Sequence, residues 1–224
     1  MPTKVGPDIT DNGLLLHLDA GAPASYTSGS TTWYDLSGNS NHATLYNVPS
    51  YNPGNRKGAF EFDGTYEYFN FPEITFTNQA FTLEFWGSIV NFDSRRTIFI
   101  GDFPGELTGN YVFFTALKED GVTNYRNFGS GGWPYKVPTG EPFMWTFVHY
   151  SDRTSTFAVN ANFNPLDNDN LSAPTDIVFK FNGFGRVSSR PYYGDLYSAK
   201  IYNRALTAEE VQQNFNAQKS RFDI

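Results

Sequence analysis

The sequence predicts an all-β protein, a sandwich of two antiparallel sheets that ends in one short C-terminal helix. Aromatic residues make up 18% of the 224 residues, with 22 Phe and 14 Tyr, and such side chains favour the pleated, half-buried surfaces of strands. Short apolar runs alternate with turn residues, of which the 20 Gly and 13 Pro supply many. A clear helix-start pattern occurs at one place, close to the C-terminus.

The first half of the chain is predicted to hold five strands. Residues 1–12 form an irregular lead-in, and residues 21–41, rich in Ser, Thr, Gly and Asn, form a long loop. The strands are expected at residues 14–18, 42–48, 58–62, 66–71 and 81–86. Phe81, Leu83 and Phe85 recur at every second position, which is the period of a strand with one face in a core.

The second half repeats this pattern at the short, even spacing that is typical of a sandwich. Its strands are expected at residues 97–100, 111–117, 123–128, 143–150, 155–160, 177–181 and 195–202. The Gly-Ser-Gly-Gly tract at residues 129–132 is predicted to be an exposed loop, because it cannot form a regular strand. Since no low-complexity linker divides the chain, residues 13–224 are predicted to be a single domain.

The helix is predicted from residue 207 onward. Thr207 can accept a hydrogen bond from the amide of Glu210, while the Glu210 side chain returns a bond to the amide of Thr207. Leu206 can pack on Val211 as a hydrophobic staple. Val211 and Phe215 lie four residues apart on one face, which is expected to dock on the sandwich.

Composition excludes several classes of protein. The chain has no cysteine, so it has neither a disulfide framework nor a thiolate metal site. Its net charge of −7 gives it no electrostatic attraction to nucleic acid or to an anionic membrane, and neither partner is expected. No apolar run approaches the ~18 residues of a membrane span, and residues 1–12 lack the apolar core of a signal peptide. A role outside the cell is then expected to depend on lysis or on assembly into a particle, unless the given sequence lacks its signal.

Four ordered segments resemble the laminin-G-like jelly-roll family of concanavalin A-like lectins and glucanases. They are LLLHLDAG at residues 14–21, TWYDLSGNSNHA at 32–43, GAFEFDG at 58–64 and GDLYSAKIYNRALTAEEV at 194–211. In the family, this order is a first strand, a loop with a Ser-Gly-Asn turn, a Phe-Asp-Gly hairpin, and a last strand that leads into a helix. The resemblance covers both ends of the chain and implies a two-sheet jelly-roll sandwich of the concanavalin A type.

The first and last of these segments are similar to the version carried by structural proteins of tailed bacteriophages. This resemblance implies a non-catalytic module of a virion, either a head decoration, a fibre or a tail-associated component. Its partners are then other virion proteins or copies of itself, and its location is the phage particle or otherwise the extracellular space.

Catalysis is considered because the same fold class houses glycan-cleaving enzymes. Their retaining versions place two carboxyl groups about 5–5.5 Å apart on either side of the scissile bond. Glu61, Asp63 and Glu67 are similar to such a set, but the spacing to Glu67 is wrong by one residue and the Asp-Gly pair predicts a turn. The three histidines lie in separate segments without metal-site spacing. The chain is therefore predicted not to be an enzyme.

The resemblance also implies a structural Ca²⁺ at the rim of the sandwich, the one cofactor that is expected. Calcium takes six to eight oxygen ligands from carboxylates, carbonyls and water. Asp19 ends the first predicted strand and Asp195 opens the last, and these two strands usually pair in the family. Asp63 is a third candidate ligand. The alternative is that Asp19 and Asp195 merely cap turns.

Two aromatic segments are predicted to be exposed and to bind either a glycan or a protein partner. Lectins stack sugar rings on exposed aromatic side chains, whereas Tyr, Trp and Arg dominate protein interfaces. The candidate residues are Tyr125, Arg126, Trp133, Tyr135, Tyr192 and Tyr193. A virion assembly module is the first functional hypothesis, a carbohydrate-binding module for host-surface glycans is the second, and an endo-glycosidase is the third.

Overall fold

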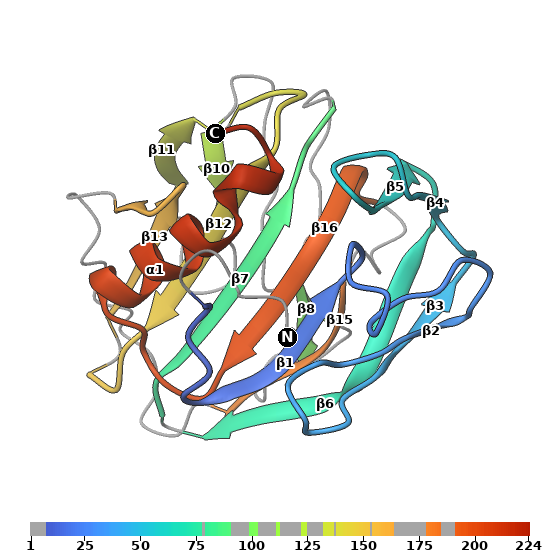
Figure 1. Cartoon of the computed structure of the whole chain (residues 1–224). Helices are drawn as coiled ribbons and strands as arrows, with labels where there is room; N and C mark the ends of the chain where they lie inside the picture. Colours follow the sequence, from blue (N-terminus) through green and yellow to red (C-terminus); the bar gives the residue numbers. More distant parts are fainter. Residues whose placement is uncertain are drawn as a thin grey trace.

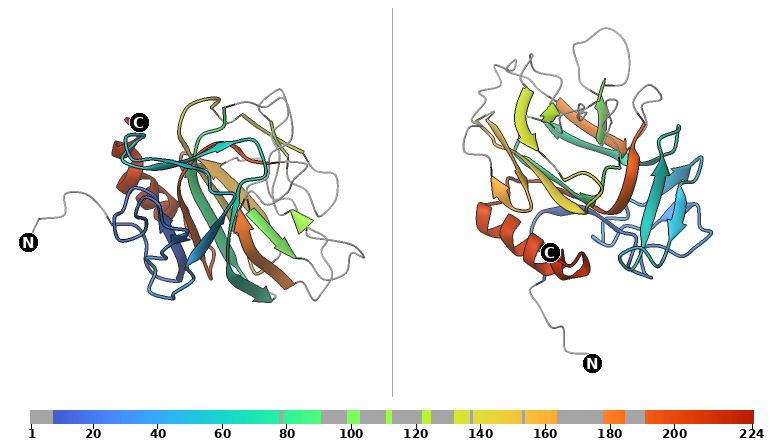
Figure 2. Two further views of the ribbon diagram at one scale, coloured as in Figure 1. Left: turned by 90° about the vertical axis from the view of Figure 1, so that its right-hand side faces the viewer. Right: turned by 90° about the horizontal axis from the view of Figure 1, so that it is seen from above.

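The computed structural model describes residues 8–77, 79–90, 99–102, 111–112, 122–124, 132–136, 138–152, 154–163, 178–184 and 191–224. At 99–102, 111–112, 122–124, 132–136 and 178–182 the backbone alone is described. Figures 1 and 2 show two facing sheets, with a helix against the outer side of one of them.

Sheet A is the larger sheet, with eight of the described strands. Its order is β14-β13-β12-β7-β16-β5-β4, and β1 pairs with β16 on the same side as β5. The strands are β1 Leu14–Asp19, β4 Ser50–Asn52, β5 Ala59–Asp63, β7 Phe81–Gly87, β12 Phe143–His149, β13 Ser155–Val159, β14 Asn162–Phe163 and β16 Tyr193–Tyr202. The antiparallel pairing of β1 with β16 joins the first strand to the last, as the resemblance implies.

Sheet B contains six of the described strands, in the order β2-β3-β6-β15-β8-β9. These strands are β2 Thr32–Trp33, β3 Ala43–Tyr46, β6 Tyr68–Thr77, β8 Phe99–Asp102, β9 Tyr111–Val112 and β15 Val178–Phe184. A separate ribbon pairs β10 Val122–Asn124 with β11 Gly132–Lys136. The predicted all-β jelly-roll sandwich with a short C-terminal helix is confirmed.

Sheet A buries both of its faces, because its central strands send alternate side chains into two different cores. In β7, Leu83 and Phe85 enter the core between the sheets, whereas Trp86 enters a second core beneath the helix. In β16, Ile201 joins the first core and Tyr202 the second. Full burial of such side chains contributes roughly 1.5–3 kcal/mol each, so both cores stabilise the sheet.

The second core is closed by α1 Ala208–Gln218 and the 3₁₀ turn η1 Lys219–Arg221. The capping box between Thr207 and Glu210 is present as predicted, and the Glu210 carboxylate also pairs with Arg204 at 2.6 Å. Phe215 stacks on Trp86 with ring centroids 5.6 Å apart. Neither described helix has the length and apolar character that crossing a membrane requires.

The Ser-Gly-Asn loop between β2 and β3 seals the outer edge of β1. The Asp35 carboxylate accepts the backbone N–H of His17 at 2.8 Å. Ser37 and Asn41 donate from their side chains to the carbonyl of Leu15 at 2.9 and 2.8 Å. The carbonyl of His17 accepts the backbone N–H of Leu36 at 2.8 Å, so the groups that Leu15 and His17 direct away from β16 are satisfied by this loop rather than by another strand.

Some predicted boundaries are wrong. β2 lies within the predicted loop at residues 21–41, β4 lies between two predicted strands where none was predicted, and β6 extends to Thr77 instead of residue 71. β11 begins at Gly132, so the end of the predicted Gly-rich loop belongs to a strand, while residues 129–131 lie outside the described part of the chain. These short strands exist because a neighbouring strand offers a pairing edge, which local sequence patterns do not report.

His17 of β1 lies opposite Lys200 of β16 in the sheet register. Its Nε2 atom is buried and has no hydrogen-bond partner among the described residues. Burial, followed by the Lys200 charge, lowers the pKa of His17 from 6.5 to about 4, against the weaker opposing effects of Asp19 and Asp35. The imidazole is therefore held neutral in the folded chain at neutral pH.

The protein is expected to lose stability as the pH falls from 6.5 to about 4. In this window the unfolded chain binds a proton at His17 that the folded chain does not bind, so acid favours unfolding. In His17→Gln, the stability difference between pH 7 and pH 5 should be smaller by about 2 kcal/mol. Urea unfolding of both proteins at the two pH values measures this effect, and an equal pH dependence would contradict it.

Candidate functional site

α1 and η1 lie against the outer face of sheet A, whereas no described helix lies on the outer face of sheet B (Figure 2). In β3, Ala43 and Leu45 are buried between the sheets, while Thr44 and Tyr46 are exposed. The first half of β6 alternates in the same way. A ligand that binds a sheet face therefore meets the side chains of β3 and β6.

Three tyrosines form an aromatic cluster on this face, which we call the tyrosine shelf: Tyr46, Tyr66 and Tyr68. Tyr46 of β3 lies opposite Tyr68 of β6, and their rings stack with centroids 4.8 Å apart and planes at 9°. Tyr66, which precedes β6, tilts against Tyr68 at a centroid distance of 4.9 Å. Tyr46 and Tyr66 are each 41% exposed, so the shelf belongs to the surface and to neither core.

Two neighbouring crossings between the sheets hold the shelf in place, one from β3 to β4 and the other from β5 to β6. Asn47, in the first crossing, has a φ of 49° and donates from Nδ2 to the carbonyl of Tyr66 at 2.6 Å. Gly64, in the second crossing, has a φ of 82° and lies against the ring of Tyr193, where a Cβ atom would meet Cγ at 3.2 Å. The backbone that carries Tyr66 is thus fixed by both turns.

Polar side chains continue the same face next to the shelf. Asn70 lies two residues beyond Tyr68 on β6 and pairs with Thr44 of β3. Thr44 is exposed, whereas Asn70 is half-buried and its Oδ1 atom is buried without a hydrogen-bond partner among the described residues. Sugars present apolar C–H faces and hydroxyl groups, so aromatic rings beside amides and hydroxyls suit them.

Four of the predicted binding residues cannot be compared with this surface at the level of side chains. Trp133 and Tyr135 lie on β11, of which the backbone alone is described. Tyr125 and Arg126 lie outside the described residues.

Tyr192 is a core residue, which corrects the expectation of an exposed aromatic there. Its side chain is fully buried, and its ring packs against Phe62 and Phe184 at centroid distances of 5.4 and 5.1 Å. Its hydroxyl donates to the carbonyl of Ser88 at 2.8 Å, and burial raises its pKa well above the usual value. The neighbouring Tyr193 is half-buried at the start of β16 and remains a candidate.

Two of the three aspartates predicted to bind calcium have separate partners. The Asp19 carboxylate accepts from the Arg221 guanidinium at 2.7 Å and from the amide of Gly21 at 2.8 Å. Asp63 accepts the amide of Thr65 at 2.8 Å within the hairpin turn. Within the described ranges, no group of three or more His, Cys, Asp or Glu side chains gathers that could hold a metal ion.

Asp195, the third of these aspartates, lies opposite Glu61 of β5. Asn55 donates from Nδ2 to both carboxylates, at 3.1 Å to Asp195 and 3.2 Å to Glu61. The hydroxyls of Ser88 and Tyr197 each donate to Asp195 at 3.1 Å. Uncharged side chains thus donate hydrogen bonds to this pair of carboxylates. Calcium binding at Asp195 stays a prediction.

The carboxylates considered for catalysis are distributed over a strand and a turn. Glu61 and Asp63 lie on β5, whereas Glu67 follows the turn and accepts the amide of Asp63 at 2.9 Å. Hydrogen bonds from Thr65 lower the pKa of Asp63, while burial raises the pKa of Glu67. These contacts make the Glu67 carboxyl group part of the turn.

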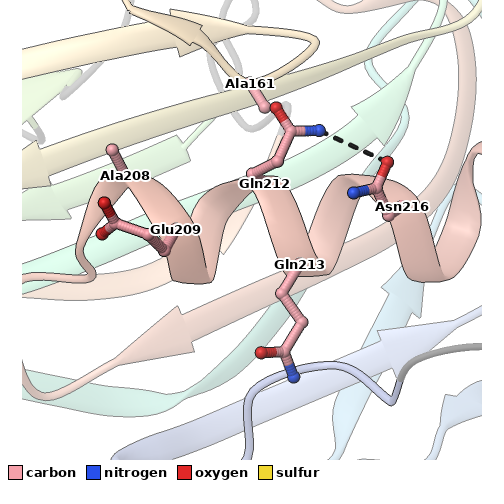
Figure 3. Close-up of a pocket in the computed structure, with 6 residues that line it drawn as sticks. All are labelled: Ala161, Ala208, Glu209, Gln212, Gln213 and Asn216. Atoms are coloured by element: carbon pink, nitrogen blue, oxygen red, sulfur yellow. Dashed lines mark hydrogen bonds between the residues drawn. The ribbon is translucent and has the colours of Figure 1, made fainter.

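A depression lies on the solvent side of α1, next to the turn between β13 and β14 (Figure 3). It is lined by Ala161, Ala208, Glu209, Gln212, Gln213 and Asn216. Gln212 donates to Asn216 at 3.3 Å, and Gln213 points to the other side of the helix, where it donates to the carbonyl of Asp8 at 2.7 Å. Because its amides do not converge and no aromatic ring lines it, the depression is a weaker candidate than the tyrosine shelf.

None of the shelf tyrosines is among the binding residues predicted from sequence. The available signal is the spacing of Tyr66 and Tyr68, since residues two apart lie on one face of an extended chain. Tyr46 carries no such signal, because only the pairing of β3 with β6 brings it to Tyr68.

A family model described as the concanavalin A-like lectin/glucanases superfamily matches residues 63–212 of the chain. The comparison of this chain with curated protein sequences found no match.

Several solved structures are similar to the chain in fold. Trypanosoma rangeli sialidase in complex with the inhibitor DANA has a TM-score of 0.72 and 13% identity, over 97% of this chain and 36% of that chain. The present chain thus spans about a third of the length of the sialidases that it matches.

Two further similar structures are smaller. Domain 4 of AbnA, a GH43 extracellular arabinanase from Geobacillus stearothermophilus in complex with arabinotriose, has a TM-score of 0.59 and 16% identity, over 91% of this chain and 98% of that chain. The binding domain of Paraclostridial Mosquitocidal Protein 1 also has a TM-score of 0.59 and 16% identity, over 92% and 52% of the two chains. At these identities the similarity establishes the fold.

Asp19→Ala is expected to destabilise the protein by about 1–3 kcal/mol, because it leaves the largely buried Arg221 guanidinium without its carboxylate. The loss should be equal in millimolar calcium and in EDTA, since the ion pair occupies this carboxylate. Thermal unfolding in both buffers measures the effect, with the exposed Asp11→Ala as a control. A calcium-dependent rise in melting temperature that Asp19→Ala abolishes would contradict it and would support the calcium site.

Proposed function

We propose that the chain, which belongs to the concanavalin A-like lectin/glucanases superfamily, is a non-catalytic module that binds glycans through the tyrosine shelf. The observation that carries this proposal is the exposure of stacked tyrosine rings on the open face of sheet B. Large aromatic side chains are costly to leave in water, and a contiguous exposed group of them marks a binding surface. The exposed Thr44 supplies a hydroxyl group for sugar hydroxyls on the same face as the rings.

The comparison with the arabinanase domain supports the glycan as ligand. That domain was solved in complex with arabinotriose, and almost its whole length matches the present fold. A chain with this fold and an aromatic surface patch is suited to bind a neutral oligosaccharide in a similar manner, whichever face the arabinanase domain uses.

The absence of catalysis is part of the proposal. Glu61, Asp63 and Glu67 are held by Asn55, by the hairpin turn and by a backbone amide respectively, which supports structural roles for all three. A retaining glycosidase needs two carboxyl groups that face each other across a bound sugar. We expect the protein to leave intact the oligosaccharides that it binds, and the release of reducing ends from them would contradict this part.

The predicted place in a phage particle is a separate proposal, and it rests on the first and last sequence motifs rather than on the site. A glycan-binding surface would serve attachment of such a particle to its host. Detection of the chain in purified particles by mass spectrometry supports this location, and its consistent absence from them contradicts it.

Replacing shelf tyrosines is expected to weaken glycan binding. A glycan array that includes arabinotriose first identifies a ligand, and titration calorimetry then measures its affinity. Tyr66→Ala and Tyr46→Ala should each lower the affinity roughly fivefold to tenfold, because each removes one aromatic contact of about 1–1.4 kcal/mol.

Tyr34→Ala is the matched control for these variants. Tyr34 is 46% exposed, close to the 41% of Tyr46 and Tyr66, but it belongs to the loop that seals β1. Its replacement should leave the affinity unchanged. Failure of the wild-type protein to bind any glycan, or equal binding by Tyr66→Ala and wild type, would refute the proposal.

A further inference from the structure

Lys200 is fully buried beneath α1, with its amine between a carboxylate and an amide. Its Nζ atom lies 2.5 Å from Oε1 of Glu84 and 2.6 Å from Oε1 of Gln218. Lys200 and Glu84 are directly opposed on β16 and β7, and both side chains are 0% exposed. Gln218 is the last residue of α1 and is half-buried.

The second oxygen of Glu84 is also engaged. It accepts from Nδ2 of Asn214 at 3.0 Å, and Asn214 donates as well to the hydroxyl of Tyr202 at 3.0 Å. Asn214 and Gln218 are four residues apart, so one face of α1 presents two amides to the same amine–carboxylate pair. The apolar residues of the second core, among them Trp86 and Phe215, surround this group.

An ion pair that is buried to this degree adds little stability over apolar residues of equal size. An amine, a carboxylate and a carboxamide in contact are also the reactants and the general base for amide exchange. The carbon of the Gln218 amide lies within roughly 3.8 Å of Nζ, given a C=O bond of about 1.23 Å. This is close to the separation of about 3–3.5 Å at which reacting atoms are poised.

We propose that Lys200 and Gln218 become joined by an intramolecular isopeptide bond, with Glu84 as the general base and acid. Glu84 takes a proton from the Lys200 ammonium group, and the freed Nζ lone pair attacks Cδ of Gln218. Glu84 then returns that proton to Nε2 as the Cδ–Nε2 bond breaks. The remaining excess proton leaves the new amide nitrogen with the ammonia, so an ammonium group and a carboxamide give a secondary amide and one ammonium ion.

The bond would link the end of α1 to the centre of sheet A. It would close a loop between positions 200 and 218 in a chain that has no cysteine for a disulfide. A covalent link of this kind restricts the unfolded chain in the same way as a disulfide does. It is independent of the glycan-binding proposal, since the group lies on the opposite side of sheet A from sheet B.

Intact-mass measurement of the purified full chain tests the proposal directly. The wild-type protein is expected to be lighter than its sequence by one ammonia. Trypsin digestion should yield a branched peptide that joins Lys200 to Gln218 and should leave the chain uncut after Lys200. Lys200→Arg keeps a cation beside Glu84 but removes the nucleophile, and Gln218→Ala removes the half-buried amide. Both variants should have the full sequence mass.

Two controls distinguish the Lys200–Gln218 bond from other reactions that release ammonia. A succinimide at Asn12–Gly13 also loses one ammonia, but mild alkali hydrolyses it and leaves an isopeptide bond intact. Asn214→Ala should retain the mass loss, because Asn214 contacts Glu84 and not the amine in this geometry. A wild-type mass equal to the sequence mass overturns the proposal, as does a branched peptide that joins Lys200 to any residue other than Gln218.

Discussion

Sheet A has to be covered on both faces, and β16 is the strand on which this requirement bears most. It pairs with β7 along one edge, and with β5 and then β1 along the other. Its side chains enter the core between the sheets at Ala199 and Ile201 and the core beneath the helix at Tyr197 and Tyr202. The two ends of the described chain are therefore drawn to one strand: β1 lies beside it and α1 lies over it.

This requirement also decides where a ligand can bind. With α1 and η1 against sheet A, the large flat surface that stays available in the described structure is the outer face of sheet B. The stacked rings of Tyr46 and Tyr68 remain on that face because β3 and β6 use their alternate residues for the core between the sheets. Burial on one side and a binding surface on the other are thus two results of the same alternation.

Elements with a local signal were predictable from the sequence. The capping box of Thr207 and Glu210 lies within four residues, and the alternation of β7 lies within seven. The order of the four motifs also predicted the two-sheet sandwich and the pairing of its first and last strands. Contacts that depend on which distant strands become neighbours were not predictable, and the tyrosine shelf is one of them.

The position of Asp195 opposite Glu61 is another contact between distant strands that the sequence could not predict. A register irregularity between Leu196 and Ser198 separates the part of β16 that pairs with β1 from the part that pairs with β5. Asp195 lies in the second part and faces Glu61, while Asp19 reaches Arg221 at the other end of the chain. Tyr192 precedes β16, and its ring packs in the core against Phe62 and Phe184. The residues next to Tyr192 in the sequence do not predict these contacts, because the two partners lie on other strands, β5 and β15.

The loop that seals β1 has a consequence for how copies of the molecule meet. An aromatic-rich sheet with a bare strand at its border can recruit the same strand of a second molecule, and repetition of that event leads to fibres. Asp35, Ser37 and Asn41 occupy the hydrogen-bonding groups through which β1 would do so. This border of sheet A is therefore closed to strand addition by a second copy of the molecule.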